Sequence, residues 1–153
     1  MTIYIGVDPG LRSGAIGAID HDGKFVGVYD IVADGDRIDA RALKQLILDM
    51  TVPGDDYAIC LEQVWTMPRQ GIASTGRFMR AYGAIGAVCE LLCDRVVYVI
   101  PQVWKKEMKM TSDKEQSLVA ARLMFPQAIL KLKKDHGKAE ALLIAEYARR
   151  TFG

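Results

Sequence analysis

Two apolar segments of this chain each end in a carboxylate, and this repetition constrains the fold more than any other feature. Residues 3–7 have the pattern of a strand buried on at least one face and lead directly into Asp8, after which Pro9-Gly10 forces a turn. Tyr57–Leu61 is a second such strand, and it leads into Glu62. The shared position predicts that the two acids lie side by side on neighbouring strands. Taken alone, Asp8 has another interpretation, in which its side chain only hydrogen-bonds the turn behind it.

The rest of the chain alternates further strands with helices, which predicts an α/β fold. The other expected strands are 13–20, 25–32 and 95–100, and the expected helices are 40–50, 72–93, 114–125 and 138–150. His21–Lys24 has Asp-Gly at its centre and predicts a hairpin turn, so the first three strands form an antiparallel meander. Residues 33–39 are expected to form a polar loop, and residues 63–76 an irregular one that carries Trp65 and Arg69.

Length and composition are those of a globular protein, and we expect residues 1–153 to form a single domain. No apolar run approaches the roughly 20 residues of a membrane span, and the N-terminus lacks the pattern of a signal peptide. The three cysteines lie inside apolar segments, where we interpret them as buried and reduced, and the sequence does not complete a zinc set around them. These features predict a cytoplasmic protein with no membrane partner.

Charge is distributed unevenly along the chain, although the net charge is only +1. Residues 1–54 carry five Lys/Arg against eight Asp/Glu, whereas residues 101–153 carry eleven against six. Such asymmetry favours an anionic partner at the C-terminal half. The other interpretation is a basic face that contacts only water. If the partner is nucleic acid, five side chains are the expected phosphate contacts, namely Arg69, Lys105, Lys106, Lys133 and Lys134.

A third carboxylate, Glu140, lies in the first turn of the last expected helix, among residues that should pack on the sheet. Asp135 and His136 immediately precede this helix, and His136 would share a face with Glu140 if the helix reached back to it. The helix dipole also favours acids at this end, and this interaction alone could explain the presence of Asp135 and Glu140. Three acids anchored on strands and a helix are nevertheless the pattern of a site with two Mg²⁺ or Mn²⁺ ions that acts on phosphodiesters. A nearby lysine would neutralise charge that develops on the phosphate.

At these acids the sequence resembles the RuvC-type Holliday-junction resolvases. The segments that carry the resemblance are Gly6–Gly10, Leu61–Val64 and Lys138–Leu142, and their order and spacing match over essentially the whole chain. The sequence is most similar to the small phage or prophage branch of that family. The resemblance implies an RNase H-like fold, with a mixed five-stranded sheet, its first three strands antiparallel, and helices on both faces. It also implies a homodimer that nicks two symmetric strands of four-way or related branched DNA.

The resemblance assigns roles to individual residues. Asp8, Glu62 and Glu140 match the first, second and final metal-binding acids. The fourth ligand of the family would fall on Gly137, so either Asp135 or His136 is expected to supply that group. His136 is also a candidate general base. Lys105 or Lys106 matches a basic residue that contacts the scissile phosphate.

Two other classes of protein share part of this pattern. Sugar kinases and actin-like ATPases begin with a similar strand and hairpin, but they need two such domains and a second phosphate loop, for which 153 residues leave no room. A non-catalytic module with a resolvase-like fold would bind branched nucleic acid or another protein without cutting, and the retained acids argue against it.

A homodimer contact is expected on the Gly-rich helix 72–93. Gly83 and Gly86 each cost about 1 kcal/mol relative to Ala in a helix interior. This cost requires an offset, and close packing against another helix would provide it.

Overall fold

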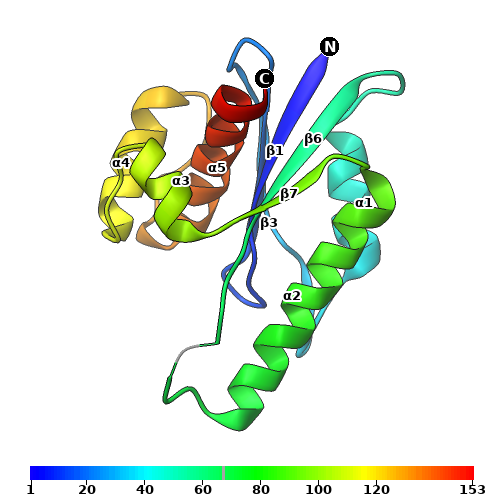
Figure 1. Ribbon diagram of the computed structural model, residues 1–153, viewed down its shortest axis with the longest axis vertical. Coiled ribbons are helices and arrows are strands. Elements are labelled where there is room, and N and C mark those ends of the chain that lie inside the picture. The colour runs from blue at the N-terminus through cyan, green and yellow to red at the C-terminus, as the bar shows by residue number, and fades with distance from the viewer. Residues whose placement is uncertain (67) are drawn as a thin grey trace.

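In the computed structural model, which describes residues 1–66 and 68–153, one five-stranded sheet lies between two layers of helices (Figure 1). The strands of this sheet are β1 (Thr2–Asp8), β2 (Ala15–Asp20), β3 (Phe25–Asp30), β6 (Asp56–Glu62) and β7 (Val96–Val99). The helices are α1 (Ala40–Asp49), α2 (Ile72–Leu92), α3 (Pro101–Glu107), α4 (Lys114–Met124) and α5 (His136–Phe152), and a short 3₁₀ turn, η1 (Lys133–Asp135), precedes α5. Helices α3, α4 and α5 lie on one side of the sheet, and α1 and α2 lie on the other.

The order of strands in the sheet is β3-β2-β1-β6-β7. Strands β1, β2 and β3 are antiparallel neighbours, whereas β6 is parallel to β1 and β7 is parallel to β6. This arrangement confirms the mixed sheet predicted from the sequence. The parallel register pairs Val7 with Leu61, so the next residue of each strand, Asp8 and Glu62, comes at the same edge of the sheet. The two acids therefore lie side by side, as predicted.

Helix α5 lies directly against the centre of the sheet because two paired strand residues have no side chain. Gly6 of β1 is paired with Gly17 of β2. A Cβ atom at Gly6 would lie 2.0 Å from the carbonyl oxygen of Ala141, and one at Gly17 would lie 3.0 Å from the side chain of Leu142. Gly6 and Gly17 thus form the surface on which α5 packs.

The two faces of the sheet bury separate apolar cores. The core on the α5 side contains Trp104, Phe125, Leu142 and Leu143, and the opposite core contains Leu43, Ile47, Ile59 and Ile85. Helix α1 contributes to the second core, and Asp39 caps its start, because the Asp39 side chain accepts a hydrogen bond from the Ala42 N–H at 2.9 Å.

Two segments differ from the prediction. Residues 33–39, expected as a polar loop, form a small hairpin of β4 (Ala33–Asp34) and β5 (Arg37–Ile38), with Gly35 in a left-handed conformation (φ +63°) at its tip. Sequence periodicity could not reveal strands of two residues, of which only Ile38 is buried. The last helix begins at His136 rather than at Lys138, because η1 leads into it directly.

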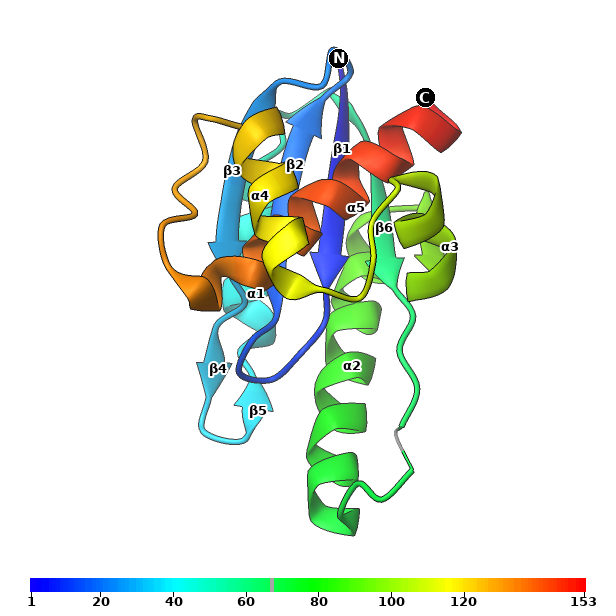
Figure 2. The ribbon, with the colours of Figure 1, turned by 90° about the vertical axis from the view of Figure 1, so that its left-hand side faces the viewer.

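Helix α2 extends beyond the edge of the sheet at which β1 and β6 end (Figure 2). Its first half is largely exposed, including Ile72 at 94%, whereas Ala81 and Ile85 in its second half are buried. Gly83 has open space at its Cβ position, and Gly86 lies against the hydroxyl of Tyr98. Among the described residues, none of the helices is long and apolar enough to cross a bilayer.

We expect Gly6→Ala to destabilise the protein by about 3 kcal/mol or more, because the added methyl group would collide with the backbone of α5 rather than with a movable side chain. Gly76→Ala is the matched control. Gly76 lies inside α2 with nothing within 4 Å of its Cβ position, so alanine there should stabilise the helix by about 0.5–1 kcal/mol. Denaturant unfolding followed by circular dichroism measures both changes. Equal stability of the two variants would contradict this account of the α5 contact.

Candidate functional site

Three carboxylates from distant parts of the chain converge at the edge of the sheet where β1 and β6 end. Asp8 and Glu62 are the last residues of these strands, and Glu140 comes from the second turn of α5. One carboxylate oxygen from each residue lies within 4.8 Å of the others. Glu62 and Glu140 are buried, and Asp8 is half-buried. The structure thus brings together the three acids that the sequence singled out.

Side chains from α3 and α4 hold two of these acids in place. The indole N–H of Trp104 donates a hydrogen bond to Oε2 of Glu62 at 2.6 Å. Oε1 of Glu140 accepts a hydrogen bond from the Ser117 hydroxyl at 3.4 Å and pairs with the Lys105 ammonium at 3.5 Å. Because Trp104 and Ser117 are completely buried, these contacts restrict the orientation of both carboxylates.

The mutual repulsion of the three acids opposes full ionisation of the cluster. Burial raises the pKa of Asp8 well above its ordinary value, and the charges of Glu62 and Glu140 raise it further, while Lys105 and Lys114 lower it. Burial also raises the pKa of Glu62, against the effect of the hydrogen bond from Trp104. A cluster that disfavours its own negative charge is stabilised by a bound cation.

The three acids fit a divalent cation that prefers oxygen ligands. Carboxylate oxygens bind Mg²⁺ at about 2.1 Å, so two ligands of one ion lie up to about 4 Å apart. Two ions in a phosphodiester-cleaving site are about 4 Å apart and share carboxylates. The separation of at most 4.8 Å among the oxygens of Asp8, Glu62 and Glu140 is compatible with either number of ions.

A second group of possible ligands is better explained as a turn. Asp20, His21 and Asp22 also have ligand atoms within 4.8 Å of one another, in the connection between β2 and β3. Oδ1 of Asp20 accepts hydrogen bonds from the backbone N–H groups of Asp22 and Lys24, both at 2.9 Å. Such side-chain bonds stabilise a tight turn, which matches the hairpin predicted here.

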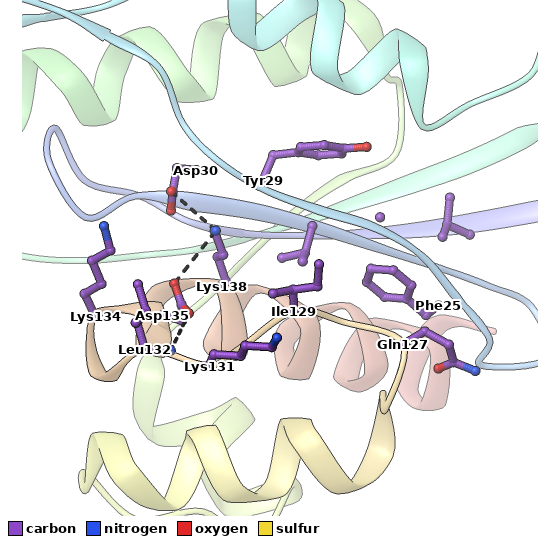
Figure 3. Close-up of a pocket in the computed structure, with 13 residues that line it drawn as sticks. Phe25, Tyr29, Asp30, Gln127, Ile129, Lys131, Leu132, Lys134, Asp135 and Lys138 are labelled. Carbon is purple, nitrogen blue, oxygen red and sulfur yellow. Dashed lines mark hydrogen bonds and ion pairs between the residues drawn. The ribbon is translucent and has the colours of Figure 1, made fainter.

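Asp135 is not among the three acids whose oxygens converge, and it lines a groove between β3 and the segment that precedes α5 (Figure 3). Its Oδ2 accepts a hydrogen bond from the Leu132 N–H at 2.8 Å, and its Oδ1 lies 3.8 Å from the Lys138 ammonium. Lys138 also pairs with Asp30 of β3 at 3.5 Å. The Asp30–Lys138–Asp135 bridge therefore ties the start of α5 to the edge strand, and Asp135 is engaged in this structural contact.

Gly137, the second residue of α5, lies near the cluster. A Cβ atom at Gly137 would be 3.4 Å from Oδ2 of Asp8 but only 2.5 Å from the carbonyl oxygen of Ser13. This position therefore faces Asp8 and yet has no room for a side chain. Nδ1 of His136 is buried and has no hydrogen-bond partner among the described residues. A buried, unpaired ring nitrogen is suited to a metal or a water molecule.

The predicted DNA contacts fall into two sets. Lys105 is half-buried and reaches Glu140, as described above. The other four, Arg69, Lys106, Lys133 and Lys134, are exposed. Trp65, in the segment after β6, is 69% exposed and borders a hollow that Gln63, Phe78 and Gln102 also line. The interpretation of the five basic residues as DNA contacts stays a prediction.

Sequence reasoning missed three residues that contribute to the site. They are Trp104, Ser117 and Lys114. For Trp104 the signal was present, because a tryptophan that is buried needs a partner for its indole N–H. For Ser117 and Lys114, nothing in the local sequence points to the acids, since the approach of α4 to the site depends on the tertiary fold.

Comparison with known structures identifies the type of fold. The chain is similar to a structure described as T. thermophilus RuvC in complex with Holliday junction substrate, with a TM-score of 0.68 and 13% identity, over 98% of this chain and 96% of that one. A second structure, of Thermus thermophilus RuvC, gives a TM-score of 0.66 and 12% identity over the same shares of the two chains. No protein-family model and no curated protein matches the sequence. The structural likeness confirms the predicted RuvC-type, RNase H-like fold.

We expect Asp8→Asn to raise the melting temperature of the metal-free protein at pH 7. The folded state raises the pKa of Asp8, so the folded protein holds this proton more tightly than the unfolded chain does. The free energy of unfolding therefore falls as the pH rises from about 4 through the folded pKa. Asparagine does not ionise, so the variant avoids this loss of stability. Each kcal/mol of stability gained should raise the melting temperature by about 2–4 °C.

Thermal unfolding in EDTA and in Mg²⁺ measures this effect. The difference between variant and wild type should shrink as the pH is lowered and vanish below about 4, where Asp8 is protonated in both states. Mg²⁺ should raise the melting temperature of wild type and leave the variant nearly unchanged. Asp36→Asn, which removes an exposed acid near the tip of the β4–β5 hairpin, is the control and should change neither value. A lower melting temperature for Asp8→Asn in EDTA would contradict the repulsion argument.

Proposed function

We propose that this protein is a divalent-metal-dependent endonuclease that resolves Holliday junctions and related branched DNA by paired strand nicks. The observation that carries the proposal is the cluster of Asp8, Glu62 and Glu140, with oxygens within 4.8 Å of one another. Three like charges held this closely are unfavourable without a cation, so a metal-binding role explains why the fold keeps them together. One structurally similar RuvC is described in complex with a Holliday junction substrate, which supports this class of substrate.

The proposed chemistry divides the work between bound metal and protein side chains. Asp8, Glu62 and Glu140 would hold Mg²⁺, or Mn²⁺ in its place, as two ions per site. When bound, such ions stabilise the attacking and leaving oxygens of a phosphodiester. Lys105, which pairs with Glu140, is suited to bind the scissile phosphate, and the charge of Lys114 also lowers the pKa of Asp8. The proposed DNA surface continues from these lysines to the exposed Lys106, Lys133, Lys134 and Arg69.

Replacement of single acids tests the proposal. We expect Asp8→Asn, Glu62→Gln and Glu140→Gln each to reduce Mg²⁺-dependent cleavage of a synthetic four-way junction by about 10³-fold or more, because each removes a proposed metal ligand. Junction binding in a gel-shift assay should be nearly unchanged, since phosphate contacts supply most of the affinity. Asp36→Asn is again the control and should cut at the wild-type rate. A wild-type protein that binds the junction but cuts nothing with Mg²⁺ or Mn²⁺ would instead support a non-catalytic module.

Two neighbouring residues, Asp135 and His136, are candidates for the fourth group of the site, and their variants distinguish them. We expect His136→Ala to reduce the cleavage rate by about 10²-fold, because Nδ1 of His136 is buried without a protein partner and would serve as ligand or general base. Asp135→Ala should keep most of the activity and lose about 1 kcal/mol of stability, because Leu132 and Lys138 lose their acceptor.

The pH–rate profile at saturating Mg²⁺ provides an independent readout. A histidine that serves as base or metal ligand acts in its unprotonated form, so His136→Ala should change the dependence of the rate on pH, whereas Asp135→Ala should keep the wild-type profile. Full activity in His136→Ala together with an inactive Asp135→Ala would show that the aspartate is the fourth group.

Paired nicks require two sites, and we propose that a homodimer supplies them through α2. The exposed first half of this helix and the open space at Gly83 support a contact there. Gly83→Leu should therefore convert a dimer into a monomer, as measured by light scattering at micromolar concentration. Asp36→Leu, at an exposed position near the tip of β4–β5, is the control for added bulk. A wild-type protein that is monomeric with and without junction DNA would refute the proposed dimer.

A further inference from the structure

Trp104 contacts two components of the candidate site at once. Its side chain is fully buried, and its indole N–H donates to Oε2 of Glu62 at 2.6 Å. The face of the same ring lies 5.4 Å from the ammonium of Lys105, a distance at which a cation and an aromatic ring attract each other. Lys105 in turn pairs with Glu140 at 3.5 Å. One indole therefore links the acid at the end of β6 to the acid on α5.

The indole has little freedom to move. Trp104 is among the largest fully buried side chains of the protein and belongs to the core that α5 also lines. Helix α3 starts with Pro101 immediately after β7, and β7 is hydrogen-bonded to β6, which ends in Glu62. The donor and its acceptor are thus carried by neighbouring parts of one rigid framework.

The indole N–H is a donor only, so the contact suits an ionised carboxylate. A carboxylate has about four lone-pair directions, and one hydrogen bond to Oε2 leaves the others of Glu62 for metal. Without this bond, Glu62 would be free to adopt other rotamers that increase its distance from Asp8 and Glu140.

We propose that Trp104 is a positioning residue of the site: its N–H orients Glu62 for metal, and its ring holds Lys105 beside Glu140. This inference rests on the proposed metal-dependent function. Loss of an outer partner of a metal ligand typically weakens metal binding by about 10–100-fold. The two contacts are separable, because phenylalanine keeps an aromatic face and lacks the N–H, whereas leucine lacks both.

The first experiment compares cleavage of a synthetic four-way junction as a function of Mg²⁺ concentration. Trp104→Phe should raise the half-saturating Mg²⁺ concentration by about 10–100-fold while the rate at saturating Mg²⁺ stays within a few-fold of wild type. Trp104→Leu should show the same shift and also a lower rate at saturating Mg²⁺, because Lys105 loses its contact with the aromatic ring. Trp65→Phe, at the exposed tryptophan, is the matched control and should leave the Mg²⁺ dependence unchanged. A purely structural role for Trp104 would lower the melting temperature without moving the Mg²⁺ dependence.

A second experiment needs no cleavage and no change at Trp104. The chain has two tryptophans, so Trp104 is the only one left in Trp65→Phe. Paramagnetic Mn²⁺ bound to Glu62 should quench the emission of this variant in a saturable manner, and the added change Glu62→Gln should abolish the quenching. This readout keeps the proposal testable even if Trp104→Phe does not fold.

The outcomes separate this inference from the function on which it rests. Wild-type protein that neither binds Mn²⁺ nor cuts the junction would overturn both. Wild-type protein that cuts normally, together with a folded Trp104→Phe of unchanged Mg²⁺ dependence, would overturn only the role of Trp104. If Trp65→Phe cuts the junction but Mn²⁺ does not quench its emission, this result too would overturn only the role of Trp104.

Discussion

The contact between α5 and the two paired glycines of the sheet determines where the site can form. Gly6 and Gly17 let the helix backbone reach β1 at a distance that no side chain would permit. Ala141 makes this contact, so its neighbour Glu140 is held at a fixed height above the strand that ends in Asp8. A helix displaced outward by the width of one methyl group would carry Glu140 away from the other acids. The distances among the three acids are thus set by backbone packing in the core.

Electrostatic repulsion among the three acids opposes the packing that holds them together. Burial and mutual repulsion raise the pKa of Asp8, and burial raises that of Glu62, so the fold holds together groups that would separate if they were free to move. The framework can sustain this because the acids stand at the ends of central strands and on a helix that is buried over most of its length. Lys105 and Lys114 provide partial compensation. The same surplus of negative charge, at positions with fixed separation, is what a divalent cation needs.

The sequence allowed prediction of those parts of the site that depend on short-range patterns. Asp8 and Glu62 could be identified because a charge at the end of an apolar strand breaks the local rule, and parallel neighbouring strands end at the same edge. Glu140 needed the family resemblance as well, since an acid near a helix start has an ordinary explanation. Trp104, Ser117 and Lys114 depend on how α3 and α4 pack, over sequence separations that periodicity does not report. The β4–β5 hairpin was missed because each of its strands has only two residues.

The start of α5 is where this chain departs from the family pattern, and the packing gives a physical reason. Position 137 faces Asp8, but the carbonyl oxygen of Ser13 occupies the space that a side chain would need, so only glycine fits without a shift of the β1–β2 connection. A ligand at this end of the site must therefore come from an adjacent position. Asp135 is held by Leu132 and Lys138 in the contact with β3. His136, the first residue of the helix, has a buried ring nitrogen that no described residue engages. Local crowding at Gly137 thus gives a physical reason why we propose its neighbour His136 as the fourth group, while the strands and α5 hold the three acids in place.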